Sequence, residues 1–94
     1  MNEKLIEKKL REGVKKLGGV AIKVASPYHR GLPDREVLMP GGYNCYVELK
    51  STGKKPTKLQ EKAIEMLRGL GFRVEVIDNQ EDLSKFLKSL KDGI

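Results

Sequence analysis

Two carboxylates and a lysine stand close together in the segment GLPDREVLMPGGYNCYVELK, residues 31–50. Asp34 begins one predicted strand. Glu48 and Lys50, with one residue between them, lie at the end of the next. Because side chains alternate between the two faces of a strand, Glu48 and Lys50 share a face. If residues 40–42 form a three-residue hairpin loop, Asp34 lies opposite Glu48 on that same face. A two-residue loop would offset Asp34 by one position.

This arrangement favours a site for a divalent cation. Two neighbouring carboxylates raise each other's pKa unless a cation lies between them. Magnesium is a hard cation that takes oxygen ligands, and it helps to ionise a water for attack on a phosphodiester. Lys50 would orient that water or stabilise charge in the transition state. The alternative is a solvated hairpin face with ordinary surface ion pairs, but the Gly-x-Pro-Asp sequence upstream favours the metal site.

The composition points to an anionic partner. The 94 residues carry a net charge of +6, which favours nucleic acid first and an acidic membrane surface second. A single cysteine, Cys45, excludes an internal disulfide and a cysteine-based zinc site, and a single histidine, His29, excludes a histidine-rich metal site. Apolar runs are too short to span a membrane, and residues 1–9 lack the apolar core of a signal peptide. We therefore expect a cytoplasmic protein with no membrane partner.

The elements that position these residues follow the order α-β-β-β-α-β-α, in a single α/β domain over residues 1–94 with one mixed sheet flanked by helices. A helix begins near Asn2 and ends at Gly18 and Gly19. Strands are expected over residues 20–25, 34–39, 43–50 and 72–77. A second helix begins at Thr57 with a capping-box pattern and ends at Gly71, and a third runs to Leu90. The expected buried stripe of the second helix is Leu59, Ala63, Met66, Leu67 and Leu70.

The sequence "GLPD" followed by "VELKSTGKKPTKLQ" resembles the VRR-NUC branch of the PD-(D/E)XK nucleases, from the first helix to about residue 86. The matched positions are Gly31, Pro33, Asp34, Glu48, Leu49, Lys50, Gly53, Thr57 and Gln60. The resemblance implies a restriction-endonuclease-like core with Asp34 and Glu48 as ligands of Mg²⁺ or Mn²⁺. It also implies metal contact from the carbonyl of Leu49 and a catalytic role for Lys50.

Two further features of that family have counterparts here. A glutamate on the first helix is represented by Glu3, within the apolar stripe, or Glu7, on its edge; we favour Glu3 as a further metal ligand and keep Glu7 as a catalytic candidate. Gln60 has two interpretations, as the partner of Thr57 in the capping box and as a group that steadies the active site. One side chain could serve in both at different times.

Residues expected to contact DNA lie in two groups. Basic residues surround the start of the second helix, where phosphate is already favoured, and others flank the loop before Asp34. Such residues hold the DNA backbone without reading sequence. The predicted DNA-binding residues are Tyr28, Arg30, Arg35, Lys54, Lys55 and Lys58.

These features predict a metal-dependent, structure-selective DNA endonuclease. A small domain has little room for a base-reading element, and resemblance to stand-alone phage and bacterial members favours four-way (Holliday) junctions cut by a homodimer. The outer sides of the first strand (Val20, Ile22, Val24) and of the last helix are the candidate dimer surfaces. Flaps, replication forks and RNA remain alternative substrates, and cleavage without selectivity remains an alternative activity. The rival class is a DNA-binding module without catalysis, which would need no metal.

Overall fold

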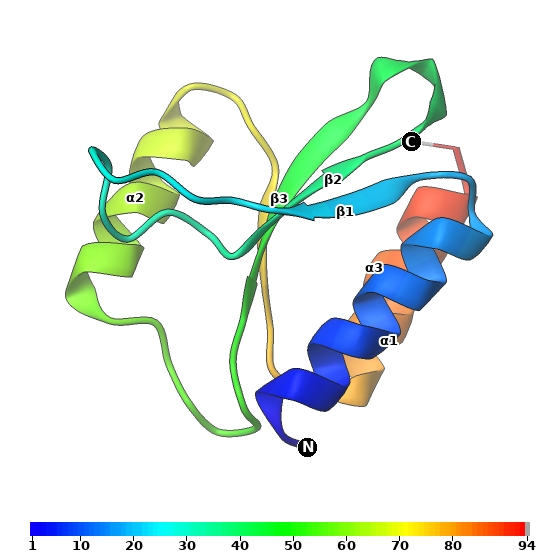
Figure 1. Ribbon diagram of the computed structural model, residues 1–94, viewed down its shortest axis with the longest axis horizontal. Helices are drawn as coiled ribbons and strands as arrows, with labels where there is room; N and C mark the ends of the chain where they lie inside the picture. Colours follow the sequence, from blue (N-terminus) through cyan, green and yellow to red (C-terminus); the bar gives the residue numbers. More distant parts are fainter. Residues whose placement is uncertain (94) are drawn as a thin grey trace.

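The computed structural model describes residues 1–93 and confirms the predicted order of elements. Figure 1 shows them along the chain. They are α1 (Glu3–Lys16), β1 (Val20–Lys23), β2 (Arg35–Leu38), the 3₁₀ turn η1 (Pro40–Gly42), β3 (Asn44–Leu49), α2 (Lys58–Gly69), β4 (Val74–Ile77) and α3 (Gln80–Lys91). None of the helices in this range is long and apolar enough to cross a membrane.

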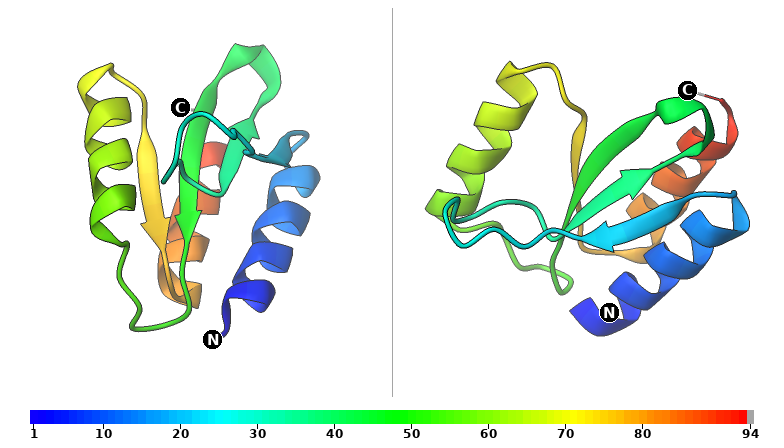
Figure 2. Two further views of the ribbon diagram at one scale, coloured as in Figure 1. Left: turned by 60° about the vertical axis from the view of Figure 1, so that its left-hand side comes forward. Right: turned by 45° about the horizontal axis from the view of Figure 1, so that its top comes forward.

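The four strands form one mixed sheet in the order β1-β2-β3-β4. The first three pair antiparallel, and β4 joins β3 in parallel after the crossover through α2. α1 and α3 lie on one face of the sheet and α2 on the other (Figure 2). The turn between β2 and β3 is the three-residue loop, because the amide of Met39 donates to the carbonyl of Tyr43 at 2.8 Å. Gly41 in this turn has φ of +85°, which favours glycine.

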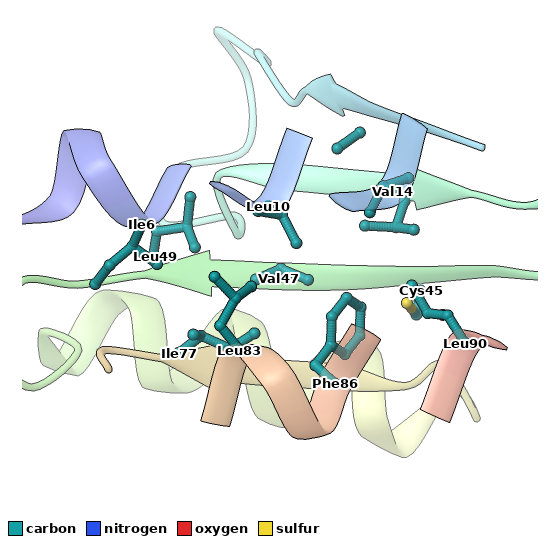
Figure 3. Close-up of a cluster of buried hydrophobic side chains, with 12 residues drawn as sticks. Ile6, Leu10, Val14, Cys45, Val47, Leu49, Ile77, Leu83, Phe86 and Leu90 are labelled. Atoms are coloured by element: carbon teal, nitrogen blue, oxygen red, sulfur yellow. The ribbon is translucent and has the colours of Figure 1, made fainter. Parts of the chain in front are cut away.

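The main hydrophobic core lies between the sheet and the pair α1 and α3 (Figure 3). The helices contribute residues at helical spacing, and β3 contributes every second residue, as its alternation predicts. The residues buried there include Ile6, Leu10, Val14, Cys45, Val47, Leu49, Leu83, Phe86 and Leu90. Because alternate residues of β3 face this core, Glu48 and Lys50 point to the other side of the sheet.

The predicted stripe of α2 is wrong at three positions. Leu59, Met66 and Leu70 are exposed, whereas Ile64 is buried with Ala63 and Leu67. The helix packs through this face onto Val74 and its neighbours in a second, smaller cluster. Helical spacing accommodates both stripes, since each contains Ala63 and Leu67, and only the position of the sheet decides between them.

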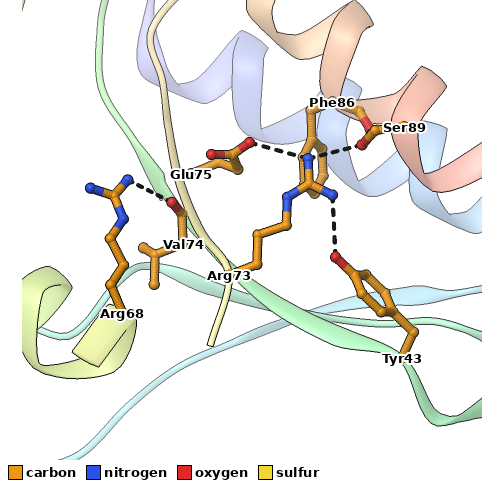
Figure 4. Close-up of polar contacts among 7 residues, drawn as sticks. All are labelled: Tyr43, Arg68, Arg73, Val74, Glu75, Phe86 and Ser89. Carbon is orange, nitrogen blue, oxygen red and sulfur yellow. Dashed lines mark hydrogen bonds and ion pairs between the residues drawn. The ribbon is translucent and has the colours of Figure 1, made fainter. Parts of the chain in front are cut away.

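A polar network around Arg73 joins the far end of β3 to β4 and α3 (Figure 4). Its guanidinium donates to the hydroxyl of Tyr43 at 3.2 Å, to Glu75 at 3.1 Å and to the hydroxyl of Ser89 at 2.9 Å. It also lies 4.9 Å from the centre of the Phe86 ring. Tyr43 precedes β3, whereas Glu48 is near its end, so this network holds the fold together away from the predicted site.

Candidate active site

Asp34 is positioned by the hairpin register. Arg35 pairs with Val47, so Asp34 lies opposite Glu48 as predicted. One carboxylate oxygen, Oδ2, accepts a hydrogen bond from the amide of Leu49 at 2.8 Å, and the Asp34 carbonyl accepts from the amide of Val24 at 2.9 Å. These two bonds fix the carboxylate beside the last residues of β3.

Glu48 is buried and incompletely hydrogen bonded. Its side chain is 1% exposed, and Oε2 accepts from Nε2 of Gln60 at 2.9 Å. The other oxygen, Oε1, is buried without a hydrogen-bond partner among residues 1–93. Burial, and then the negative charge of Asp34, raise the pKa of Glu48 to about 7, although the Lys50 ammonium opposes them. A solvated hairpin face is therefore excluded for this carboxylate.

Lys50 is confined next to the Glu48 carboxylate. Its Nζ lies 3.5 Å from Oε2 of Glu48, and the side chain is only 16% exposed. Its amide donates to the carbonyl of Ile77 on the adjacent strand at 3.1 Å, which fixes the backbone. The ammonium is thus held at the site before any ligand arrives.

Gln60 makes the contacts of both interpretations in the same structure, with Thr57 in the capping box and with Glu48. Its Oε1 accepts from the amide of Thr57 at 2.9 Å, while the Thr57 hydroxyl accepts from the amide of Gln60 at 3.2 Å. The other end of the same amide donates to Glu48. Because the oxygen of the Gln60 amide accepts and its nitrogen donates, one side chain both caps α2 and orients the Glu48 carboxylate.

The two candidate glutamates of α1 reach the same cavity as Asp34. This cavity, of about 220 Å³, is lined by Glu3, Lys4, Glu7, Lys23, Asp34, Arg35 and Leu49. Glu7 is bound by two arginines, accepting from Nη2 of Arg35 at 2.8 Å and from Nε of Arg11. The expectation that Glu3 lies within the apolar stripe is wrong, because Glu3 is exposed in the first turn and the buried face begins at Ile6. Both glutamates therefore line a cavity with Asp34, and Glu7 already forms ion pairs with two arginines.

Two lysines of this cavity, Lys4 and Lys23, were not identified from the sequence. Lys23 pairs with Arg35 in the β1–β2 register. That register could have indicated its position, because Arg35 adjoins Asp34. Lys4 carries no distinguishing pattern among the many lysines of α1.

The predicted DNA-binding residues separate into two environments. The exposed ones are Tyr28, Arg30, Lys54, Lys55 and Lys58. Arg35 instead bridges Glu7 and the carbonyl of Ala21, which it contacts through Nη1 at 3.3 Å. The structure thus has the Arg35 side chain bridging the sheet and α1, in the cavity that Lys4 and Lys23 also line.

The donor set fits a hard divalent cation. Within residues 1–93, no three histidine, cysteine, aspartate or glutamate side chains gather closely enough to hold a metal. Two carboxylates, Asp34 and Glu48, lie opposite each other on β2 and β3 and could hold a cation, and the resemblance adds the backbone carbonyl of Leu49 as a candidate donor. The buried, unpaired Oε1 of Glu48 is the observation that favours a cation, since such an atom is costly without a partner.

Comparisons with known proteins agree with this geometry. No family model matches the chain. A protein of Acyrthosiphon pisum secondary endosymbiont phage 1, named "Putative nuclease p44", is 44% identical over 90 residues, which cover 96% of each chain. A solved structure described as a VRR_NUC domain superposes with a TM-score of 0.85 at 29% identity, covering 92% of this chain and 94% of the other.

The similarity to the protein named "Putative nuclease p44" and the superposition on a VRR_NUC domain both extend over more than nine-tenths of the chain, and both agree with the resemblance carried by residues 31–60. The chain belongs to the VRR-NUC family of the PD-(D/E)XK nucleases.

Proposed function

We propose that this protein is a metal-dependent DNA endonuclease whose reaction centre is formed by Asp34, Glu48 and Lys50. The observation that carries the proposal is the buried Oε1 of Glu48, which has no hydrogen-bond partner among residues 1–93, on a side chain that lies opposite Asp34 and 3.5 Å from the Lys50 ammonium. Membership in a nuclease family supports the reaction class. The choice of DNA, of internal cleavage and of Mg²⁺ or Mn²⁺ is our proposal.

Each residue has a role that follows from its contacts. Asp34 and Glu48, with the Leu49 carbonyl, would hold the cation, which supplies a polarised phosphoryl oxygen and an acidified water. Gln60 keeps the Glu48 carboxylate oriented through its 2.9 Å hydrogen bond. Lys50 positions the attacking water or stabilises the charge that develops on the phosphate.

The glutamates of α1 complete the site from the other side. Glu3 and Glu7 line the cavity shared with Asp34, so either would hold a water for the cation or for attack. Glu7 already pairs with Arg35, which favours a positioning role for it. Glu3 remains our candidate for direct metal contact.

The DNA backbone would approach along the start of α2. Lys54, Lys55 and Lys58 are exposed around this helix N-terminus, where the helix dipole also favours phosphate. Contacts of this kind fix the duplex without reading its sequence. The described chain offers no further element for the major groove, so we propose selection by DNA shape.

We further propose a homodimer that cuts four-way junctions, because two symmetric cuts require two symmetric sites. Val20 and Ile22 of β1 are exposed beside Leu38 of β2, which supports this face of the sheet as the dimer surface. The last helix is a poor alternative as the dimer surface, since its exposed residues include Glu81, Lys85 and Lys88.

Cleavage of flaps or forks is the second candidate activity. We place the activity in the cytoplasm of a bacterial host.

The test is cleavage of branched DNA by the wild type and by Lys50→Ala, with Mg²⁺ or with excess chelator. We expect cleavage only by the wild type in Mg²⁺, and a loss of at least ~100-fold in the variant, since one positioned charge contributes that much in comparable sites. Lys62→Ala, an exposed lysine in the middle of α2, is the matched control and should cleave normally. Equal rates for Lys50→Ala and the wild type would refute the assignment.

A further inference from the structure

The loop between β1 and β2 presents a nearly naked aromatic residue. Tyr28 is 96% exposed, the highest exposure among the large hydrophobic residues noted at the surface. Arg30 and His29 follow it and are also exposed. An exposed aromatic ring two residues from an arginine is suited to stacking on the base of a nucleotide while the arginine contacts its phosphate.

The base of this loop is tied to the reaction centre. The amide of Val24, the first residue of the loop, donates to the carbonyl of Asp34, its last residue, at 2.9 Å. The two ends of the loop are thus joined at the candidate metal ligand. Near the tip, the amide of His29 donates to the hydroxyl of Ser26 at 3.2 Å. The loop is therefore braced at its two ends and across its turn.

The loop is also seated on α2, as Figure 1 shows where it extends from the sheet toward that helix. Gly31 has φ of +82°, and a Cβ there would lie 2.7 Å from the carbonyl oxygen of Leu59 and 2.9 Å from its carbonyl carbon. Only glycine permits this approach of two backbones. The next residue along α2 is Gln60, which bonds Glu48, so the seat of the loop adjoins the site.

These contacts limit how far Tyr28 lies from the reaction centre. It is three residues from Gly31, and an extended chain of three residues spans about 10 Å at most. That length corresponds to about three base-pair rises of 3.4 Å. A base contacted by Tyr28 would therefore lie within a few base-pair rises of the contact between Gly31 and Leu59, which adjoins the site through Gln60.

We propose that Tyr28 is a specificity-determining residue that stacks on an unpaired or unstacked nucleobase next to the cleavage position. This inference rests on the proposed nuclease function and deepens it, because it names the feature of the DNA that is selected. In intact duplex the bases are stacked on one another and offer no free face. At a branch point the continuous stack is interrupted and a base is unstacked more easily, so the ring would distinguish branched from linear DNA.

The experiment measures binding in Ca²⁺, which replaces Mg²⁺ so that binding is read without cleavage. The probes are a four-way junction with 2-aminopurine at the branch point and a linear duplex of the same length. The variants are Tyr28→Ala and, as the matched control that keeps the ring, Tyr28→Phe. Because the side chain is exposed, both variants should fold, which thermal unfolding verifies.

We expect Tyr28→Ala to lower affinity for the junction by about 5- to 100-fold, as loss of one stacked base would, with less than about 2-fold change for the duplex. Tyr28→Phe should match the wild type on both probes. The 2-aminopurine signal should be perturbed by the wild type and by Tyr28→Phe but not by Tyr28→Ala. Equal losses on junction and duplex, or no loss on either, would overturn the inference.

The outcome is separable from that of the nuclease proposal. If the wild type binds the junction but cuts nothing in Mg²⁺, the nuclease proposal fails, and the stacking role is still decided by fluorescence and affinity. If Lys50→Ala abolishes cleavage while Tyr28→Ala changes neither affinity nor the fluorescence, the nuclease stands and the stacking role is removed.

Discussion

Replacing Glu48 by glutamine should make the metal-free protein more stable at alkaline pH. Folding raises the pKa of Glu48 from 4.5 to about 7, so between these values the folded protein keeps a proton that the unfolded chain has lost. The stability of the wild type therefore falls as pH rises through this window, and the whole penalty is present above pH 7. Glutamine keeps the shape of the side chain and an oxygen for Gln60, but carries no charge.

The size of the effect follows from the difference in pKa. The difference, 7 minus 4.5, is about 2.5 pKa units, and at about 1.4 kcal/mol per unit the whole penalty is about 3–4 kcal/mol. Urea unfolding at pH 5 and at pH 8.5, in a chelator, gives the free energy of unfolding of each protein. Relative to the wild type, Glu48→Gln should gain about 2–3 kcal/mol between the two pH values, because a small part of the penalty is already present at pH 5.

The comparison between pH values removes any constant effect of the substitution, such as an altered contact with Lys50. Glu65→Gln, an exposed glutamate of α2, is the matched control and should follow the wild type at both pH values. Saturating Mn²⁺ should stabilise the wild type at pH 8.5 but not Glu48→Gln, since the cation replaces the proton. Parallel pH dependence in the wild type and Glu48→Gln would refute the reasoning.

Three further substitutions test how the site is supported. Gly31→Ala should lower the free energy of unfolding by about 1–3 kcal/mol, because a Cβ would clash with the backbone of Leu59. Gly41→Ala, at a similar φ but in open space, should lower it by only about 1 kcal/mol. Urea unfolding of both variants separates the cost of the clash from the cost of the backbone strain. Gln60→Ala should lose about 1 kcal/mol of stability, because it removes one hydrogen bond of the capping box. It should also bind Mn²⁺ more weakly in calorimetry, because it removes the hydrogen bond to the buried Glu48 carboxylate. Unchanged Mn²⁺ affinity would contradict a role of Gln60 in orienting Glu48. Arg73→Met should lower stability by about 2 kcal/mol or more by removing three side-chain hydrogen bonds, yet leave cleavage rates per folded molecule unchanged at the distant site, which single-turnover assays check.

The hairpin and the core of this fold were predictable because local rules determine them. A three-residue turn with glycine at residues 41 and 42 fixes the register, and the register places Asp34 opposite Glu48. The alternation along β3 assigns Cys45, Val47 and Leu49 to the core. The capping box at Thr57 likewise involves residues only three positions apart.

Features that depend on how elements meet were not predictable. The orientation of α2 was wrong because two stripes fit its periodicity, and the sheet selects the one with Ile64. The attachment of Arg35 to Glu7 joins residues 28 positions apart, and no local pattern pairs them. The depth at which Glu48 is buried, which distinguishes a reaction centre from a surface ion pair, also arises only when α2 covers the sheet.

The most direct test of the central claim is the dependence of junction cleavage on metal concentration, in the wild type and in Asp34→Asn. Single-turnover rates would be measured over a Mg²⁺ titration, with folding of the variant verified by its unfolding curve. If Asp34 and Glu48 hold the catalytic cation, the wild-type rate rises from zero and saturates with Mg²⁺, while Asp34→Asn shows no saturable rise. Cleavage at full rate in chelator, or a wild-type titration curve from Asp34→Asn, would contradict the account.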